Sequence, residues 1–283
     1  MKKIAVIGAG TMGNGIAHVF AQKGFQVNLI DTQSAALEKA IQTIQKNLDR
    51  QIAKGIIDEA AKKSTLSNIT CIAHLEEGVK EADLVVEAAT ENSEIKKSIF
   101  SALDKYAPAN CILASNTSSI SITQLGAVTN RPEKVIGMHF MNPVPVMKLV
   151  EIINGQATTA AVTESIVALS TIIGKIPCVV KDAPGFIANR ILMPMINEAV
   201  LAFEEGISDA ATIDQIMKLG MAHPMGPLQL ADYIGLDVCK NILEIMEAGF
   251  ENKKYKPAAL LSKMVAEGKL GVKSGSGFYD YNK

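Results

Sequence analysis

The sequence predicts an α/β domain built on a mostly parallel, doubly wound sheet, followed by a smaller all-α domain. Short apolar runs alternate with helical segments up to about residue 182, which is typical of a parallel sheet covered by helices. A glycine-rich turn separates the first strand from the first helix. Beyond the DAPG segment at residues 182–185 the strand signal ends. We therefore expect one domain at residues 1–183 and a second at residues 184–283.

The first domain opens with an apolar run at residues 4–7, which is typical of a strand buried on both faces. A helix is predicted from about residue 12 to residue 23, where Gly24 ends it, and residues 27–30 form the next strand. Residues 34–64 are polar and helix-prone, and they are too many for a simple crossover between two strands.

The later part of the first domain repeats the pattern. Strands are predicted at residues 84–86 and 111–114, with a helix at about 93–106 between them. Three further strands are expected at residues 135–140, 149–153 and 178–180. From Phe186 onward, apolar residues recur at helical spacing instead. They form one wide stripe that comprises Ile187, Ile191, Leu192, Met195, Ile196, Ala199 and Val200.

Composition and charge exclude several functions. Of the 283 residues, 48% are hydrophobic and 20% are charged, which suits a globular protein with a large core. The net charge of −1 provides no basic field for nucleic acid or an anionic membrane. No apolar run is long enough to span a bilayer. The four cysteines lie far apart, so we expect no metal site, reduced thiols and a cytoplasmic protein.

The glycine-rich turn reads Gly8-Ala9-Gly10-Thr11-Met12-Gly13 and matches the GxGxxG pattern of Rossmann-type domains. In this pattern the first glycine makes the turn, the second lets a pyrophosphate approach the backbone, and the third lets helix and strand pack closely. The start of the helix offers free N–H groups to phosphates. Asp31 ends the second strand, where a carboxylate binds the ribose 2′-hydroxyl and repels a 2′-phosphate. No arginine follows it at Thr32 or Gln33, so we predict NAD.

A histidine and a glutamate are the candidates for acid–base catalysis. His139 ends a predicted strand, and ligands of open α/β sheets gather at the carboxyl ends of strands. Glu151 lies in the apolar run LVEII, where a carboxylate is costly unless it is paired. Such a carboxylate can orient an imidazole and stabilise its charged form. Spacing alone leaves His139 open between catalysis and a structural role, although His18, His74 and His223 are weaker candidates.

Longer motifs extend over nearly the whole chain. They are VVEA at residues 85–88, ASNTSS at 114–119, HFMNPVPVMKLVE at 139–151, DAPGFIANR at 182–190, HPMGP at 223–227 and GSGFY at 275–279. With the glycine-rich turn, they resemble the 3-hydroxyacyl-CoA dehydrogenase family, most closely its short-chain bacterial 3-hydroxybutyryl-CoA members. The resemblance implies NAD-dependent interconversion of (S)-3-hydroxyacyl-CoA and 3-oxoacyl-CoA. It also implies a homodimer formed through the carboxyl-terminal helices.

The resemblance assigns roles to single residues. His139 and Glu151 match the family's catalytic pair, whereas Ser118 and Asn189 match its substrate-polarising residues. The alternative for Asn189 is a helix cap just after Pro184-Gly185. Four further residues match cofactor contacts and read otherwise as ordinary surface polar groups: Glu91, Lys96, Asn142 and Lys273. Ser118 also matches a cofactor contact, and without the resemblance it is one member of a turn rich in serine and threonine.

Two cations are candidates for binding CoA. Arg50 and Lys54 stand at i, i+4 spacing on one face of a predicted helix. In the family that the chain resembles, a helical arm in this region meets the CoA moiety, and Lys54 is the closer match to a known contact. A solvated charged face is the alternative.

Two other functions remain open. A dehydrogenase of free hydroxy acids, similar to the gulonate dehydrogenases, would share the glycine motif, His139 and Glu151. Activity with acetoacetyl-CoA but not with free 3-hydroxy acids would separate the two enzymes. A nicotinamide-binding protein without catalysis is the second alternative. The intact set of Ser118, His139, Glu151 and Asn189 argues against it.

Overall fold

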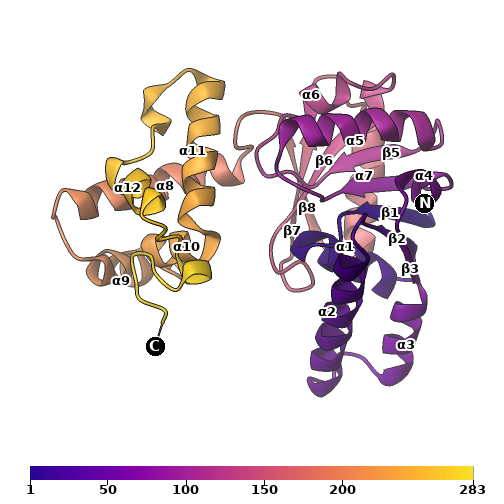
Figure 1. Ribbon diagram of the computed structural model, residues 1–283, viewed down its shortest axis with the longest axis horizontal. Coiled ribbons are helices and arrows are strands. Elements are labelled where there is room, and N and C mark those ends of the chain that lie inside the picture. Colours follow the sequence, from indigo (N-terminus) through magenta and orange to yellow (C-terminus); the bar gives the residue numbers. More distant parts are fainter. Residues whose placement is uncertain (283) are drawn as a thin grey trace. The chain divides into compact units, whose positions relative to one another are not determined.

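A computed structural model describes residues 1–282, which divide into two units, Met1–Ala183 and a second unit that begins at Pro184. The first unit contains helices and strands, drawn from indigo to magenta in Figure 1, and the second contains helices, drawn in orange and yellow. The predicted fold class is therefore confirmed. Among the described residues, no helix combines the length and the apolar character needed to cross a membrane.

The first unit is organised around an eight-stranded sheet with the order β3-β2-β1-β4-β5-β6-β7-β8. Every neighbouring pair is parallel except β6 and β7. The strands are β1 (Lys3–Ile7), β2 (Gln26–Ile30), β3 (Ile69–Ile72), β4 (Leu84–Glu87), β5 (Ile112–Ser115), β6 (Val135–Phe140), β7 (Leu149–Asn154) and β8 (Ile176–Lys181). The chain order reverses between β1 and β4, which is where open α/β sheets bind ligands.

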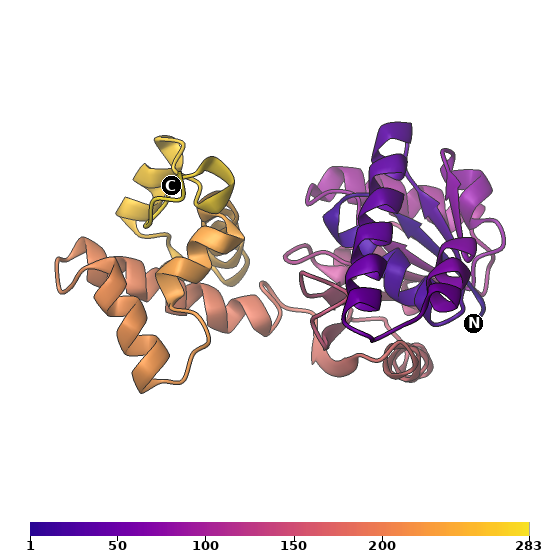
Figure 2. The same cartoon turned by 90° about the horizontal axis from the view of Figure 1, so that it is seen from below.

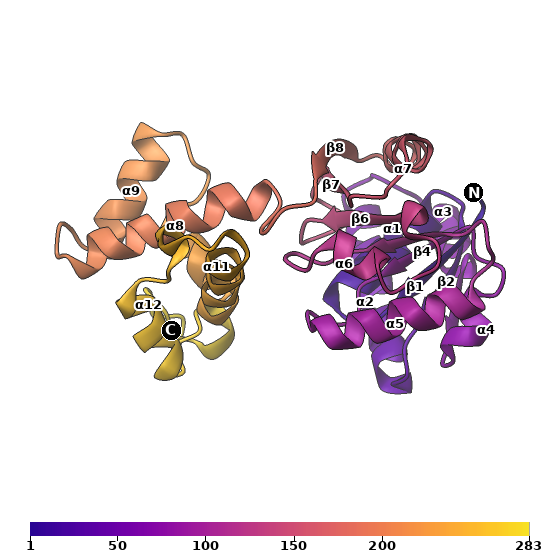
Figure 3. The same cartoon turned by 90° about the horizontal axis from the view of Figure 1, so that it is seen from above.

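Helices cover both faces of this sheet. They are α1 (Thr11–Gln22), α2 (Ser34–Ala53), α3 (Glu59–Ser67), α4 (Leu75–Val79), α5 (Ser93–Tyr106), α6 (Ile122–Gly126) and α7 (Ala160–Ile172), with a 3-10 helix at Pro132–Lys134. Helices α1 and α7 share one hydrophobic core with the sheet. Helices α4, α5 and α6 lie on the opposite side (Figure 3). Because both faces are covered, β1 is a continuous apolar run from Ile4 to Ile7.

Two segments of the first unit differ from the sequence-based expectation. The long helical region after β2 is a pair of helices, α2 and α3, which lie side by side (Figure 1). Strand β3 was not predicted, because it forms the edge of the sheet and its residues are partly exposed. An edge strand covered on one side needs no continuous apolar run, so the sequence pattern that identifies its neighbours is lacking.

The second unit consists of α8 (Ala188–Glu204), α9 (Ala210–Gly220), α10 (Pro227–Ile234), α11 (Leu236–Phe250) and α12 (Ala259–Ala266), with 3-10 helices at Lys253–Tyr255 and Val272–Ser274 (Figure 2). Its own core includes Ile196, Leu228 and Leu243. The apolar stripe expected in α8 is buried only in its later part, since Ile191 is 67% exposed whereas Ile196 is fully buried.

Candidate active site

The only antiparallel strand pair of the described sheet places His139 opposite Glu151. His139 Nδ1 lies 3.1 Å from Glu151 Oε2, and both side chains are almost completely buried. Directly opposed residues of antiparallel strands point to the same face, so the strand pairing brings these two together. The carboxylate accepts the Nδ1–H of the ring, which leaves Nε2 of a neutral imidazole as a proton acceptor.

Ser118 completes a chain of three polar side chains. Its Oγ lies 3.1 Å from Nε2 of His139. It follows β5, and Asn116 in the same segment accepts a hydrogen bond of 2.9 Å from the backbone N–H of Phe140. The end of β6 is therefore bound directly to the segment that carries Ser118. A hydroxyl and an imidazole nitrogen at this position can both bind one oxygen atom of a ligand.

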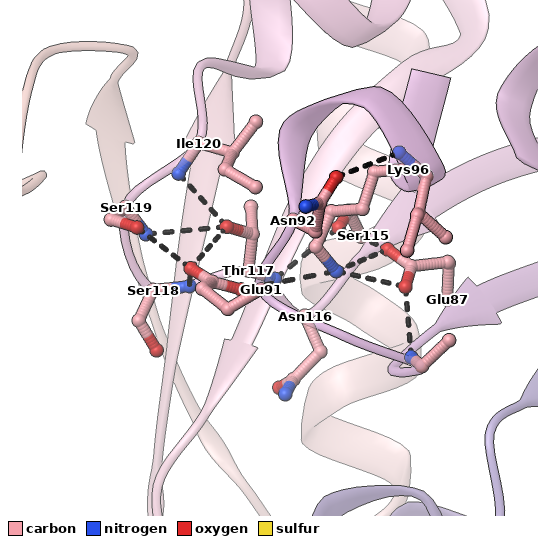
Figure 4. A network of polar contacts seen from close by, with 12 residues as sticks. Glu87, Glu91, Asn92, Lys96, Ser115, Asn116, Thr117, Ser118, Ser119 and Ile120 are labelled. Atoms are coloured by element: carbon pink, nitrogen blue, oxygen red, sulfur yellow. Dashed lines mark hydrogen bonds and ion pairs between the residues drawn. The ribbon is translucent and has the colours of Figure 1, made fainter. Parts of the chain in front are cut away.

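Glu91 fixes the segment that contains Ser118 (Figure 4). One of its carboxylate oxygens accepts the backbone N–H of Ser118 at 2.8 Å. The same oxygen accepts the hydroxyls of Thr117 at 2.7 Å and Ser119 at 2.8 Å. Three donors from one short segment thus meet a single carboxylate oxygen, which holds the backbone of Ser118 in place.

A second carboxylate, Glu87, lies completely buried at the end of β4 (Figure 4). It binds the Lys96 ammonium at 2.8 and 2.6 Å and accepts the Ser115 hydroxyl at 2.7 Å. It also accepts the backbone N–H of Ala89 at 2.8 Å. The Lys96 ammonium is itself buried and lies 3.9 Å from Glu91. Our sequence reasoning missed Glu87, although it carries the signal that identified Glu151, a carboxylate in an apolar strand.

The glycine-rich turn has two packed glycines and one open glycine. A Cβ atom on Gly8 would lie 2.6 Å from the carbonyl oxygen of Ala88, and one on Gly13 would lie 1.7 Å from that of Gly8. By contrast, a Cβ atom on Gly10 would have no neighbouring atom within 4 Å. Helix α1 begins directly afterwards, and no side chain caps its first N–H groups. The turn therefore presents open backbone and free donors, as a bound phosphate requires.

A cavity of about 450 Å³ adjoins this turn, and Asn142 lines it together with Gly10 and Thr11. Asp31 lies at the end of β2 next to the turn. Its carboxylate accepts the backbone N–H groups of Ala9 at 2.8 Å and Gln33 at 2.9 Å. Each carboxylate oxygen retains a second lone pair for a ligand hydroxyl. The predicted cofactor residues Gly10, Thr11 and Asn142 thus border one cavity. Asp31 binds the backbone of Ala9, which also lines this cavity.

A second cavity of about 470 Å³ lies at the carboxyl end of α2. Arg50 and Lys54 line one side of it, and Pro145 and Val146 from the loop between β6 and β7 line the other. The two predicted CoA-binding cations therefore border a cavity shared with the loop that joins His139 to Glu151.

Two predicted residues belong to the second unit. Asn189 lies in the first turn of α8 and is 8% exposed. Lys273 lies in the 3-10 helix Val272–Ser274, where its ammonium is 2.5 Å from Asp237. Both stay predictions as site residues. In the described part of the chain, no group of three or more histidine, cysteine, aspartate or glutamate side chains is arranged to hold a metal ion.

Comparisons with known proteins agree along the whole chain. Residues 3–183 match the model of the 3-hydroxyacyl-CoA dehydrogenase NAD binding domain, and residues 185–281 match that of the C-terminal domain. A probable 3-hydroxybutyryl-CoA dehydrogenase of Bacillus subtilis is 50% identical, over 100% of this chain and 98% of that protein. The human mitochondrial hydroxyacyl-coenzyme A dehydrogenase is 44% identical, over 99% and 91%. The crystal structure of (S)-3-hydroxybutyryl-CoA dehydrogenase from Ralstonia eutropha matches with a TM-score of 0.97 and 48% identity, covering 100% of both chains.

Proposed function

Because the chain belongs to the 3-hydroxyacyl-CoA dehydrogenase family, we propose that it interconverts (S)-3-hydroxyacyl-CoA and 3-oxoacyl-CoA, with 3-hydroxybutyryl-CoA and acetoacetyl-CoA as the main pair. The protein is an NAD-dependent oxidoreductase, and the resemblance found in the sequence is confirmed. The observation that carries the proposal is the series of contacts from the partly buried Ser118 through the buried His139 to the buried Glu151.

The glycine-rich turn supports NAD as the cofactor, because its open backbone at Gly10 and the adjoining cavity fit a dinucleotide pyrophosphate. Bound NAD supplies the acceptor or donor of the hydride. We assign the remaining cofactor contacts to Glu91, Lys96, Ser118, Asn142 and Lys273. Lys96 differs from the others in that its ammonium is buried against Glu87.

His139 moves the proton in this proposal. Its Nε2 takes the 3-hydroxyl proton when the alcohol is oxidised and returns it when the ketone is reduced. Glu151 holds the Nδ1–H and stabilises the imidazolium. The Ser118 hydroxyl, next to Nε2, and the Asn189 carboxamide are the groups that we assign to the developing charge on the substrate oxygens.

The test is oxidation of NADH by the purified protein with acetoacetyl-CoA and with free acetoacetate. We expect turnover with the CoA thioester and none with the free acid. Turnover with the free acid alone would favour a hydroxy-acid dehydrogenase. The absence of turnover with either compound, in a protein that binds NADH, would favour a non-catalytic role.

The carboxylate of Asp31 leads to a prediction about cofactor choice. The unmutated enzyme should prefer NADH to NADPH strongly. Asp31→Ala should lower the ratio of kcat/KM for NADH to kcat/KM for NADPH by roughly tenfold or more, since bringing the Asp31 carboxylate next to the 2′-phosphate of NADPH costs several kcal/mol. Asp31→Asn serves as the control that keeps an acceptor for the N–H of Ala9. Equal kcat/KM values for both cofactors in the unmutated enzyme would contradict the assignment.

The cavity at Arg50 and Lys54 leads to a prediction about CoA. The double change Arg50→Glu and Lys54→Glu should raise KM for acetoacetyl-CoA by roughly tenfold or more, because each hydrogen bond to a charged group contributes about 1.5–3 kcal/mol. KM for NADH should stay the same. The control is Lys46→Glu, an exposed lysine of α2 that lines neither cavity. An unchanged KM for acetoacetyl-CoA would mean that both cations form an ordinary solvated surface.

Assembly and compartment are also proposals. The exposed apolar side chains of the second unit, among them Ile191, Ile207 and Leu219, support a homodimer formed through its helices. All four cysteines are free thiols, and two of them, Cys71 and Cys178, are exposed. Exposed thiols support a reducing compartment, so we place the enzyme in the cytoplasm.

A further inference from the structure

A buried lysine that is not part of the Ser118, His139 and Glu151 contacts binds the loop between β6 and β7. This loop, residues 141–148, connects His139 to Glu151 and lines both cavities described above. Lys175 precedes β8 and is only 7% exposed. Its ammonium donates hydrogen bonds to two backbone carbonyls of the loop, that of Val144 at 2.5 Å and that of Met147 at 2.7 Å.

This lysine lacks an acidic partner among the residues that the structure describes. Within the described residues, no carboxylate lies within 4.0 Å of the Lys175 ammonium. Its neighbour His18, on α1, is fully buried, and burial together with the charge of Lys175 lowers the pKa of His18 to about 4. His18 is therefore neutral at working pH. A buried cation without a counter-ion is costly, and here two carbonyl dipoles offset that cost.

The two bonds from Lys175 add to the hydrogen bonds that the loop makes within its own backbone. The backbone N–H groups of Val146 and Met147 donate hydrogen bonds to the carbonyl of Pro143 and close a turn. The carbonyls of Val144 and Met147 instead accept hydrogen bonds from Lys175. Helix α1 also packs directly on the loop: a Cβ atom on Gly15 would lie 2.8 Å from that of Val144. The loop thus contacts both the first helix and the lysine, and its residues line the two cavities.

We propose that Lys175 is a positioning residue of the reaction, because its ammonium fixes the loop that forms the wall shared by the cofactor and CoA cavities. The inference about CoA depends on the proposed function, whereas the inference about the cofactor cavity depends only on NAD binding. Catalytic chemistry itself should depend less on Lys175, since His139 and Glu151 are held by the strand pairing of β6 and β7.

The first test replaces Lys175 by methionine, which keeps an unbranched side chain and removes the donors. The dissociation constant for NADH, measured by fluorescence titration, and KM for acetoacetyl-CoA should each rise by about tenfold, the effect of losing one hydrogen bond to a charged group. The value of kcat at saturation should change much less. The control is Lys181→Met, at the exposed far end of β8, which should leave both constants unchanged.

The second test separates the donors from the space that they fill. Lys175→Ala lacks three methylene groups and the ammonium, which together have the shape of propylammonium. Added propylammonium should restore tighter NADH binding, whereas 1-propanol, of similar size and without charge, should not. Two results would show that Lys175 only fills space. One is a dissociation constant for NADH in Lys175→Met equal to that of the unmutated protein. The other is recovery of NADH binding in Lys175→Ala that is no greater with propylammonium than with 1-propanol. NADH binding is measured without acyl-CoA, so it decides the question even if acetoacetyl-CoA is not a substrate.

Discussion

Replacing His139 by glutamine should lower kcat for acetoacetyl-CoA reduction by roughly two to four orders of magnitude, the usual contribution of a general acid–base group. Glutamine has no nitrogen that can release and take up a proton near neutral pH. NADH binding should survive, because the glycine-rich turn and Asp31 lie on other segments of the chain. Steady-state kinetics give kcat, and fluorescence titration gives the dissociation constant for NADH.

Glu151→Gln is the companion of this experiment. The amide keeps the size of the carboxylate but removes its charge, and it can bind the wrong tautomer of the imidazole, as happens when the acid of a catalytic triad is changed to its amide. We expect a loss of kcat smaller than that of His139→Gln, with NADH binding again retained. If the His139→Gln enzyme kept a nearly normal kcat, the proton would have to come from another group and the proposed mechanism would be wrong.

Replacing Lys96 by methionine should lower the free energy of unfolding by about 3–5 kcal/mol, because removal of one partner from a buried ion pair leaves an uncompensated charge. Here the remaining charge is Glu87, which is fully buried and would keep only the Ser115 hydroxyl and the N–H of Ala89 as donors. Urea denaturation, followed by circular dichroism, measures the difference from the shift of the unfolding midpoint.

The neighbouring residue provides the control for this prediction. Lys97 pairs with Glu94 near the surface, and Lys97→Met should leave the unfolding midpoint almost unchanged. The double variant Glu87→Gln with Lys96→Met should be more stable than Lys96→Met alone, since it buries no unpaired charge. A midpoint for Lys96→Met equal to that of Lys97→Met would show that the buried pair contributes little.

The strands that surround the active site could be predicted from sequence because they are covered on both faces. Strand β6 was expected at residues 135–140 and is found there, since each of its residues is buried. Strand β3, at the edge, left no such pattern. The boundary between α2 and α3 could not be predicted, because residues 34–64 are polar and helix-prone throughout.

The proposed catalytic pair and the polar network around Glu87 differ in how far the sequence predicts them. Glu151 was predicted as a site residue because it lies in an apolar strand. A carboxylate there is buried away from water, so the carboxylate needs a hydrogen-bonding or charged partner. Lys96 was distinguished from Lys97 only by the family resemblance, and its pairing with Glu87 was not predicted, because two adjacent lysines in a polar helix look alike in sequence. Successive positions of a helix point about 100° apart, and only the packing of α5 determines that Lys96 faces Glu87 and Lys97 faces Glu94.

The pairing of His139 with Glu151 across β6 and β7 has a consequence for how this fold can diversify. These two residues are aligned by the register of an antiparallel ladder, and the ladder does not depend on the length of the loop that closes it. Insertions or deletions at residues 141–148 can therefore reshape the walls of the two cavities without separating His139 from Glu151. A shift of one residue in the strand register would instead turn His139 to the opposite face of the sheet. Under the proposed function, the residues that line the cavities and the residues that move the proton thus lie in different parts of one hairpin, so selection or design can alter the first while keeping the second.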